Sequence, residues 1–265
     1  MTMSLSYRQR GLSMIELMVA LLLSSFLILG VTQIYIDNKR TYIYQQGQGE
    51  NQENSRFALM FLERQLAKAG YRRDPRSELP DTFPASPTLG CGFEEGQTVA
   101  RVDATTICLR YQPRDKYETD CFGSQPFSAS TALDAPYEAL TTNSTIVEKI
   151  SVSDGVLTCQ ASTSNSSDLI EGISGIYFDY GVNDSVYDRD ISKYSAEPVT
   201  GEYVRSLRYS ILFTATPNNL TEGMSNRVCG DEGDWKKATG IDFTCETGKL
   251  YQMVSGSSTL RNLMP

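Results

Sequence analysis

The chain of 265 residues contains no histidine. Serine–histidine and cysteine–histidine catalysis both need an imidazole base, so this absence excludes them, together with histidine-ligated metal sites. The G-x-S-x-G motif is also missing, and no carboxylate pair, phosphate-binding loop or other nucleophile motif stands out. We therefore expect no catalytic site, no cofactor and no metal, although the composition does not disprove carboxylate or lysine chemistry.

Charged side chains are also missing from residues 17–36, directly after the lone acid Glu16. An apolar stretch of about 20 residues is what a helix needs to cross a bilayer. Arg8 and Arg10 precede it, as the positive-inside rule expects of a cytoplasmic flank. A carboxylate at the start of such a span is costly, so Glu16 needs a specific role.

Two simpler interpretations of this segment fit less well. A cleaved signal peptide would end at a small-residue cleavage site, but Ser24 and Ser25 lie inside the run and apolar residues continue to position 36. A plain signal anchor explains the span and the arginines, but it gives no reason for Gly11 or Glu16.

The segment 11–20, GLSMIELMVA, resembles the class III leader of type IV pilins and pseudopilins. The resemblance implies that a prepilin peptidase in the membrane cuts after Gly11 and that the new N-terminal residue, Leu12, is N-methylated. Glu16 then becomes the fifth residue of the mature chain. The family usually has phenylalanine where Leu12 stands, a mild departure because the position needs a large apolar side chain.

The chemistry of Glu16 suggests a part in filament assembly. A lone carboxylate in hydrocarbon must be paired or protonated. The freed amine of Leu12 in a neighbouring subunit would supply a positive partner, and the first turn of a helix favours negative charge. We hypothesise that Glu16 sets the axial register of the subunit in a filament. The simpler alternative is an interfacial acid that snorkels to the headgroups.

The formal net charge is −8, and losing Arg8 and Arg10 with the leader would leave 22 basic against 32 acidic residues. An acidic chain without a basic run is not suited to phosphate backbones. We therefore expect no nucleic-acid partner.

Six cysteines all follow the predicted membrane segment, without any C-x-x-C. This even, widely spaced set favours disulfides in an oxidising periplasm over zinc, redox chemistry or buried free thiols. Fifteen pairings are possible, and locality favours only Cys229 with Cys245. The candidates are Cys91, Cys108, Cys121, Cys159, Cys229 and Cys245.

A helix is predicted over residues 14–69, where proline is absent. Its second half carries apolar residues at helical spacing, and we expect this stripe to pack on the protein's own sheet. Gly70 is placed to end the helix in a left-handed conformation, whereas Gly47 and Gly49 are weak points inside it. The stripe consists of Leu59, Leu62, Leu66 and Ala69.

Short β-prone runs follow an irregular, proline-rich stretch at 72–92. Asp154-Gly155 between two of the runs is a strong hairpin signal. We predict strands at 105–111, 146–153, 156–161, 173–180, 203–215 and 250–255.

Residues 162–167 and 182–198 are predicted as polar loops. The second contains Asp184, Asp188 and Asp190, but it lacks the glycine and closing glutamate of a calcium loop, and we favour a solvated acidic loop. Lys236-Lys237 beside Trp235 could form a small contact site; an ordinary turn is favoured.

These elements predict an α+β fold in which one long N-terminal helix packs on an antiparallel β-sheet head with long, disulfide-linked loops. The expected parts are a leader at 1–11, a membrane or filament-core half of the helix at 12–36, an amphipathic half at 37–70, and a periplasmic head at 71–265.

A narrower resemblance covers the rest of the helix. Residues 52–59 (QENSRFAL), 61–64 (FLER), 69–72 (AGYR) and 259–263 (TLRNL) are similar to the PilW type of minor pilin. The resemblance implies a low-abundance subunit of a Gram-negative inner membrane that joins other minor pilins to prime type IV pilus assembly and to cap the tip. Its implied partners are the other minor pilins, the major pilin, the inner-membrane assembly platform and a tip adhesin.

Two alternatives remain open. A minor pseudopilin of a type II secretion system would have the same architecture. A membrane-anchored periplasmic enzyme or ligand-binding module would use the helix only as a tether, and the 15 tyrosines could serve its binding surface.

Overall fold

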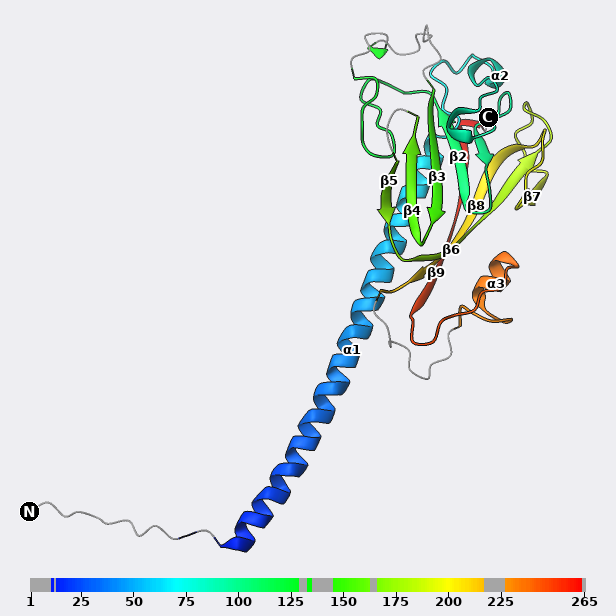
Figure 1. Ribbon diagram of the computed structural model, residues 1–265. Coiled ribbons are helices and arrows are strands. Elements are labelled where there is room, and N and C mark those ends of the chain that lie inside the picture. Colours follow the sequence, from blue (N-terminus) through cyan, green and yellow to red (C-terminus); the bar gives the residue numbers. More distant parts are fainter. Residues whose placement is uncertain are drawn as a thin grey trace, which may run out of the picture. The chain divides into compact units, whose positions relative to one another are not determined.

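The computed structural model describes residues 11, 13–128, 133–134, 145–162, 166–216 and 227–263. Two compact units are present, Met1–Gln46 and Gly47–Pro265. Helix α1 (Met14–Lys68) contributes its first part to one unit and its second part to the other (Figure 1). The division falls at Gly47, one of the two glycines singled out in the sequence.

The end of α1 is held by residues from other parts of the second unit. Gly70 adopts the left-handed conformation with φ of 73°, and its N–H donates to the carbonyl of Arg110 at 2.9 Å. Asn262, close to the C-terminus, donates from Nδ2 to the carbonyls of Ala67 (2.9 Å) and Ala69 (3.0 Å). The last carbonyls of the helix therefore have protein partners in place of the missing next turn.

Two antiparallel sheets form the second unit, where the sequence predicted one. The five-stranded sheet has the order β1-β2-β3-β4-β5. Its strands are β1 (Val99–Arg101), β2 (Thr106–Tyr111), β3 (Ile146–Ser153), β4 (Val156–Ala161) and β5 (Ser166–Ile170). Asp154 (φ 51°) and Gly155 (φ 78°) form the β3–β4 turn with positive φ at both positions, as the hairpin signal predicts.

The second sheet has four strands in the order β7-β6-β8-β9. Its strands are β6 (Ile173–Asn183), β7 (Lys193–Ser195), β8 (Tyr203–Thr214) and β9 (Tyr251–Thr259). The chain passes from the first sheet to the second at Gly172, which has φ of 82°. Strand alternation identifies a buried face but not the neighbouring strand, so the sequence did not reveal this change of sheet.

Both predicted polar loops are too long, because they include strand residues. Strand β5 begins at Ser166, inside the predicted loop 162–167. Strand β6 continues to Asn183 and β7 lies within 182–198. β5 and β7 are edge strands with mostly exposed side chains, so backbone pairing rather than an apolar pattern defines them.

Short helices connect the strands. They are α2 (Leu79–Thr82), η1 (Thr88–Gly90), α3 (Asp234–Thr239) and η3 (Arg261–Leu263). The predicted turn at Lys236-Lys237 was wrong, because α3 occupies it. Trp235 is buried beside Leu212 and Tyr251, and Lys236 forms an ion pair with Asp231 at 2.8 Å. Burial of the indole fixes α3 to the sheet.

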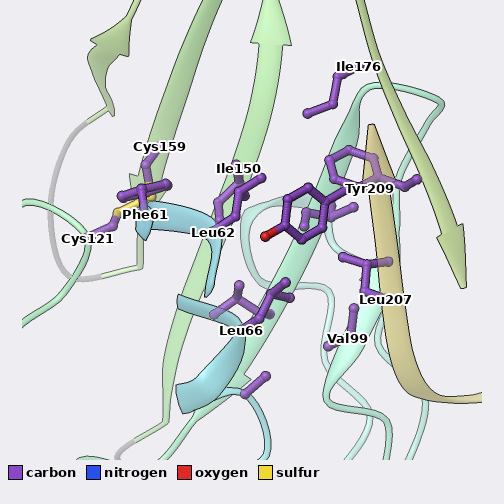
Figure 2. Close-up of a cluster of buried hydrophobic side chains, with 14 of the residues drawn as sticks. Phe61, Leu62, Leu66, Val99, Cys121, Ile150, Cys159, Ile176, Leu207 and Tyr209 are labelled. Atoms are coloured by element: carbon purple, nitrogen blue, oxygen red, sulfur yellow. A yellow bond between two sulfur atoms is a disulfide. The ribbon is translucent and has the colours of Figure 1, made fainter. Parts of the chain in front are cut away.

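The main core lies where α1 meets both sheets (Figure 2). Leu62 and Leu66 are fully buried, and Ile150 of the first sheet and Leu207 and Tyr209 of the second belong to the same cluster. Burying a leucine side chain stabilises a fold by about 1.5–3 kcal/mol. The predicted apolar stripe is confirmed, and it joins two sheets rather than one.

All six cysteines are disulfide-bonded. Cys229 pairs with Cys245, which is the pair that locality favours. The other bonds join Cys91 to Cys108 and Cys121 to Cys159. Cys121–Cys159 fastens a loop to strand β4 in the main core, so its contribution to stability is combined with burial of the sulfur atoms.

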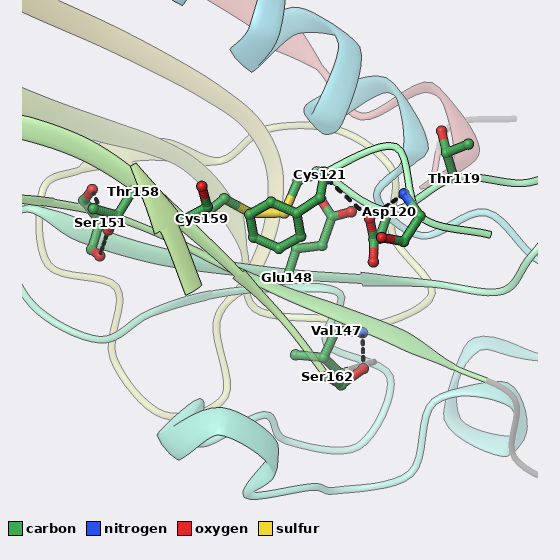
Figure 3. The surroundings of a disulfide bond; sticks show 12 residues. Thr119, Asp120, Cys121, Val147, Glu148, Ser151, Thr158, Cys159 and Ser162 are labelled. Carbon is green, nitrogen blue, oxygen red and sulfur yellow. Dashed lines mark hydrogen bonds between the residues drawn. A yellow bond between two sulfur atoms is a disulfide. The ribbon is translucent and has the colours of Figure 1, made fainter. Parts of the chain in front are cut away.

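A buried carboxylate lies beside the Cys121–Cys159 disulfide (Figure 3). Glu148 of β3 is fully buried, and the hydroxyl of Tyr111 donates to its Oε1 at 2.7 Å. Burial raises the pKa of Glu148 to about 7, although Lys68 in the last turn of α1 and the Tyr111 hydrogen bond favour the charged form. Burial also raises the pKa of Tyr111, with the Glu148 charge as the next cause.

Substitution of Gly70 by alanine tests the capping geometry. An added Cβ would lie 2.5 Å from Leu263 Cδ2 in a left-handed conformation. We expect Gly70→Ala to lower the free energy of unfolding by about 2–4 kcal/mol, through backbone strain and steric crowding. Gly90→Ala is the matched control, because Gly90 has φ of 74° with open space around it. If chemical denaturation showed the same loss of unfolding free energy for Gly70→Ala and Gly90→Ala, crowding against Leu263 would make no contribution.

Glu148 predicts a pH dependence of stability. A carboxyl whose pKa is raised in the folded state binds its proton more tightly there than in the unfolded state, so stability falls as pH rises through the window from 4.5 to 7. The shift corresponds to about 3 kcal/mol, and this loss persists above pH 7. Glu148→Gln should remove that part of the pH dependence in denaturant titrations. If the free energy of unfolding of Glu148→Gln changed with pH between 4.5 and 8 as steeply as that of wild type, Glu148 would not be the group responsible.

Candidate processing and assembly site

The start of α1 is organised by Ser13 and Glu16. Ser13 accepts a hydrogen bond at its carbonyl from the Leu17 N–H (3.1 Å), and its own N–H donates to Glu16 Oε2 (3.0 Å). The second of these bonds is half of a capping box, in which the acid three residues into the helix satisfies the N–H of the capping residue. Leu12, the predicted methylated residue, lies outside the described residues.

Sequence reasoning missed Ser13, although the signal was present. The spacing Ser13-x-x-Glu16 is the S-x-x-E pattern of a capping box. The structure thus gives Glu16 a function within its own chain as well as the proposed one between chains. Its side chain is exposed, and Oε1 has no hydrogen-bond partner in the described part of the chain. One carboxylate oxygen therefore caps the helix while the other can accept from a second molecule.

The residues that follow form an apolar surface. Among the described residues, α1 is the one helix that is long and apolar enough to cross a membrane. Leu21, Phe26 and Leu29 are each more than 60% exposed. A contiguous apolar surface of this size is not stable in water, so it requires lipid or other apolar helices around it.

The hydroxyl groups within this surface form hydrogen bonds with backbone carbonyls of their own helix. The hydroxyl of Ser24 donates to the carbonyl of Ala20 at 2.7 Å, and that of Thr32 donates to the carbonyl of Ile28 at 2.7 Å. Ser25 donates to a carbonyl in the preceding turn in the same way. Such internal hydrogen bonds lower the cost of placing hydroxyl groups in hydrocarbon. These serines and threonine are therefore compatible with a membrane or a dry helix bundle.

The acidic loop at 182–198 is held by protein contacts. Arg205 is buried, and its guanidinium donates to the carbonyls of Ser185 and Val186 at 2.9 Å each. Asn183 Nδ2 donates to the Asp190 carboxylate at 3.3 Å. The structure does not gather Asp184, Asp188 and Asp190 into a metal-binding group in the described residues.

One group has the distances of a metal site but not its chemistry. Potential ligand atoms of Cys121, Glu148 and Cys159 lie within 4.8 Å of one another. The two sulfur atoms are bonded to each other, so neither is available as a thiolate ligand. The arrangement is a buried disulfide beside a buried carboxylate.

Comparison with known proteins identifies the N-terminal segment. Residues 6–32 match the model of the prokaryotic N-terminal methylation motif. No match is found among curated proteins. Among solved structures, the chain is similar to a type IV-like pilin, TTHA1219, from Thermus thermophilus, with 10% sequence identity and a TM-score of 0.48. The alignment covers 80% of this chain and 96% of that one, and a similarity at this level does not by itself assign a family.

The motif covers Gly11, Leu12 and Glu16, the residues that the leader resemblance singled out. It overlaps the exposed apolar part of α1, and antiparallel sheets with disulfides follow. The chain therefore combines an N-terminal methylation motif with an exposed apolar helix and a disulfide-bonded head of antiparallel sheets.

Proposed function

We propose that the chain is a minor pilin of the PilW type, which joins other minor pilins in a complex that primes type IV pilus assembly and occupies the tip. The observation that carries the proposal is the methylation motif at 6–32, which overlaps an apolar helical surface with no cover in its own unit. A tether alone would need the apolar surface but not the motif. A filament subunit needs both.

Processing by a prepilin peptidase is the first step in this proposal. Gly11 is exposed, and a Cβ placed there would meet no described atom within 4 Å. Its φ is not in the left-handed region either. Packing and backbone conformation therefore give no reason for glycine at this position, which supports recognition by an external enzyme. Cleavage after Gly11 would expose Leu12 as the methylated N-terminus.

Assembly is the second step. Before it, residues 12–36 lie in the inner membrane with the head in the periplasm of a Gram-negative cell. During it, the same surface moves from lipid to the helices of other subunits, and the free oxygen of Glu16 accepts from the N-terminal amine of a neighbour. The assembly platform, the major pilin and a tip adhesin are the remaining proposed partners.

The mature N-terminus tests the processing step. Mass spectrometry of the chain from its own cells should find N-methylated Leu12 and no residues 1–11. Gly11→Ala should leave the leader attached, because the peptidase requires glycine there, while the unfolding of the head stays unchanged. An uncleaved wild-type chain would contradict the proposal.

Variants of Glu16 separate capping from pairing between subunits. Glu16→Gln keeps an oxygen that can accept from the Ser13 N–H but has no charge, whereas Glu16→Ala removes both. We expect both variants to enter filaments at least about tenfold less than wild type, since a lost buried charge pair costs more than about 1.4 kcal/mol. Glu53→Ala, an exposed acid of the same helix, is the control. Immunoblots of sheared filaments measure how much of each variant enters the filament. If Glu16→Gln entered filaments at the wild-type level, Glu16 would act only as a helix cap and not as a charged partner between subunits.

Purification of the tagged chain with its associated subunits distinguishes the two kinds of filament. Minor pilins and a pilus adhesin in the complex would support the proposal. If components of a type II secretion pseudopilus were recovered in their place, the chain would be a minor pseudopilin.

A further inference from the structure

Strand β9 forms one outer edge of the four-stranded sheet. The order β7-β6-β8-β9 gives it a single neighbour, β8, along its whole length from Tyr251 to Thr259. The pairing is regular, without a bulge, from Ser206 opposite Thr259 to Thr214 opposite Tyr251. Its other side carries the backbone N–H and C=O groups that form no hydrogen bond with β8.

The pairing pattern identifies those backbone groups. Hydrogen bonds from Ala215 N–H to the Leu250 carbonyl and from Leu260 N–H to the Arg205 carbonyl flank the ladder at 3.0 and 2.9 Å. Opposite residues in an antiparallel ladder alternate between bonded and non-bonded pairs. The even-numbered residues 250–260 therefore face β8, and the odd-numbered ones direct their N–H and C=O groups outward. These outward groups have no hydrogen-bond partner among the described residues, and belong to Tyr251, Met253, Ser255, Ser257 and Thr259.

This edge lacks the usual protection against pairing. Natural edge strands are kept short or carry charges, proline or bulges. Strands β1 and β7 have three residues each and contain Arg101 and Lys193, and β5 contains Asp168. β9 has nine residues, with neither charge nor proline. Of the four edge strands in the described sheets, β9 alone is both long and uncharged.

The strand itself is firmly held, so its edge presents a fixed template. Val254 packs against the main core, and Gln252 Nε2 donates to Ser55 Oγ of α1 at 3.4 Å. The ring of Tyr209 covers Gly256, where an added Cβ would lie 2.5 Å from the tyrosine hydroxyl. Ser255 and Ser257 on the opposite face are exposed, and Ser255 shares a hydrogen bond with Ser210 at 2.8 Å. The face toward α1 is anchored. On the opposite face Tyr251 and Met253 pack in the cluster around Trp235, whereas the side chains from Ser255 onward are exposed.

We propose that the outward edge of β9 binds an extended, charge-poor segment of another subunit in the same filament-tip complex, which adds a strand to the four-stranded sheet. An extended backbone is the complement of alternating N–H and C=O groups, and the nine residues offer about 27 Å of edge. Charged side chains on the incoming strand would find no opposite charge in β9, so a charge-poor segment fits best. This inference rests on the proposed function for the source of the strand.

Ser257 allows a test that changes the edge but not the sheet. Its N–H points outward and makes no bond to β8, so Ser257→Pro removes a donor and places the pyrrolidine ring on the edge. Ser257→Ala removes the same hydroxyl but keeps the N–H. The full-length tagged chain and both variants are purified from the native cells in mild detergent, and thermal unfolding checks that the heads are equally stable.

Two measurements test the proposal. The first is the amount of minor-pilin complex recovered, where we expect Ser257→Pro to retain at least about tenfold less than Ser257→Ala, which should match wild type. The second is hydrogen exchange over 251–259 in the wild-type chain, where the fast-exchanging outward amides of the free chain should become protected in the complex. If Ser257→Pro unfolds, the exchange measurement on wild type decides alone.

The outcomes separate this inference from the proposed function. A complex that forms with wild type but leaves the β9 amides unprotected overturns the added strand and leaves the minor-pilin function standing. If the purified chain forms a dimer in light scattering and its β9 amides are protected there, the added strand comes from a second copy of this chain and not from another subunit. Failure of wild type to recover any pilin-like subunit overturns both proposals.

Discussion

The apolar surface of the first part of α1 is the constraint on which the rest depends. Large side chains such as Leu21 and Phe26 lie exposed within the unit that contains them, and lipid or neighbouring helices must cover them. The details of this segment suit that requirement. Hydroxyl groups bond to carbonyls of their own helix, Glu16 accepts a hydrogen bond from the N–H of Ser13, and charged residues are absent from 17 to 36.

The second part of α1 meets a different requirement, because it must remain attached to a head built from short strands. Leu62 and Leu66 bind it to both sheets, Asn262 caps its last carbonyls, and Gly70 turns the chain without crowding Leu263. Disulfides fasten the connecting loops at Cys91, Cys121 and Cys229. The end of the helix and residues 262–263 thus stabilise one another.

Much of this was predictable from local patterns. The helix, its apolar stripe and its glycine end follow from spacing, and the Asp154-Gly155 hairpin follows from its turn residues. The boundaries of β3 and β4 agree with the predicted ones residue for residue. At the N-terminus, the leader resemblance predicted the residues that the methylation motif covers.

What the sequence did not reveal depends on contacts between distant residues. Strands β5 and β7 have few apolar side chains, since an edge strand needs only a partner's backbone, and they were read as loops. The division into two sheets depends on a chain reversal at Gly172 that no alternation pattern contains. Burial of Arg205 and Glu148 also has no local signal, because each is paired with residues far away in sequence. Ser13 was a different kind of miss, as its capping pattern was present and was not used.

Photo-crosslinking from position 26 tests the central claim most directly. A benzoyl-phenylalanine in place of Phe26 reports which molecules cover the middle of the apolar surface in living cells. The account predicts crosslinks to lipid in the membrane fraction and to the N-terminal helices of other pilin-like subunits in sheared filaments. Crosslinks confined to lipid in every fraction would show that the helix is a permanent anchor and never a filament element.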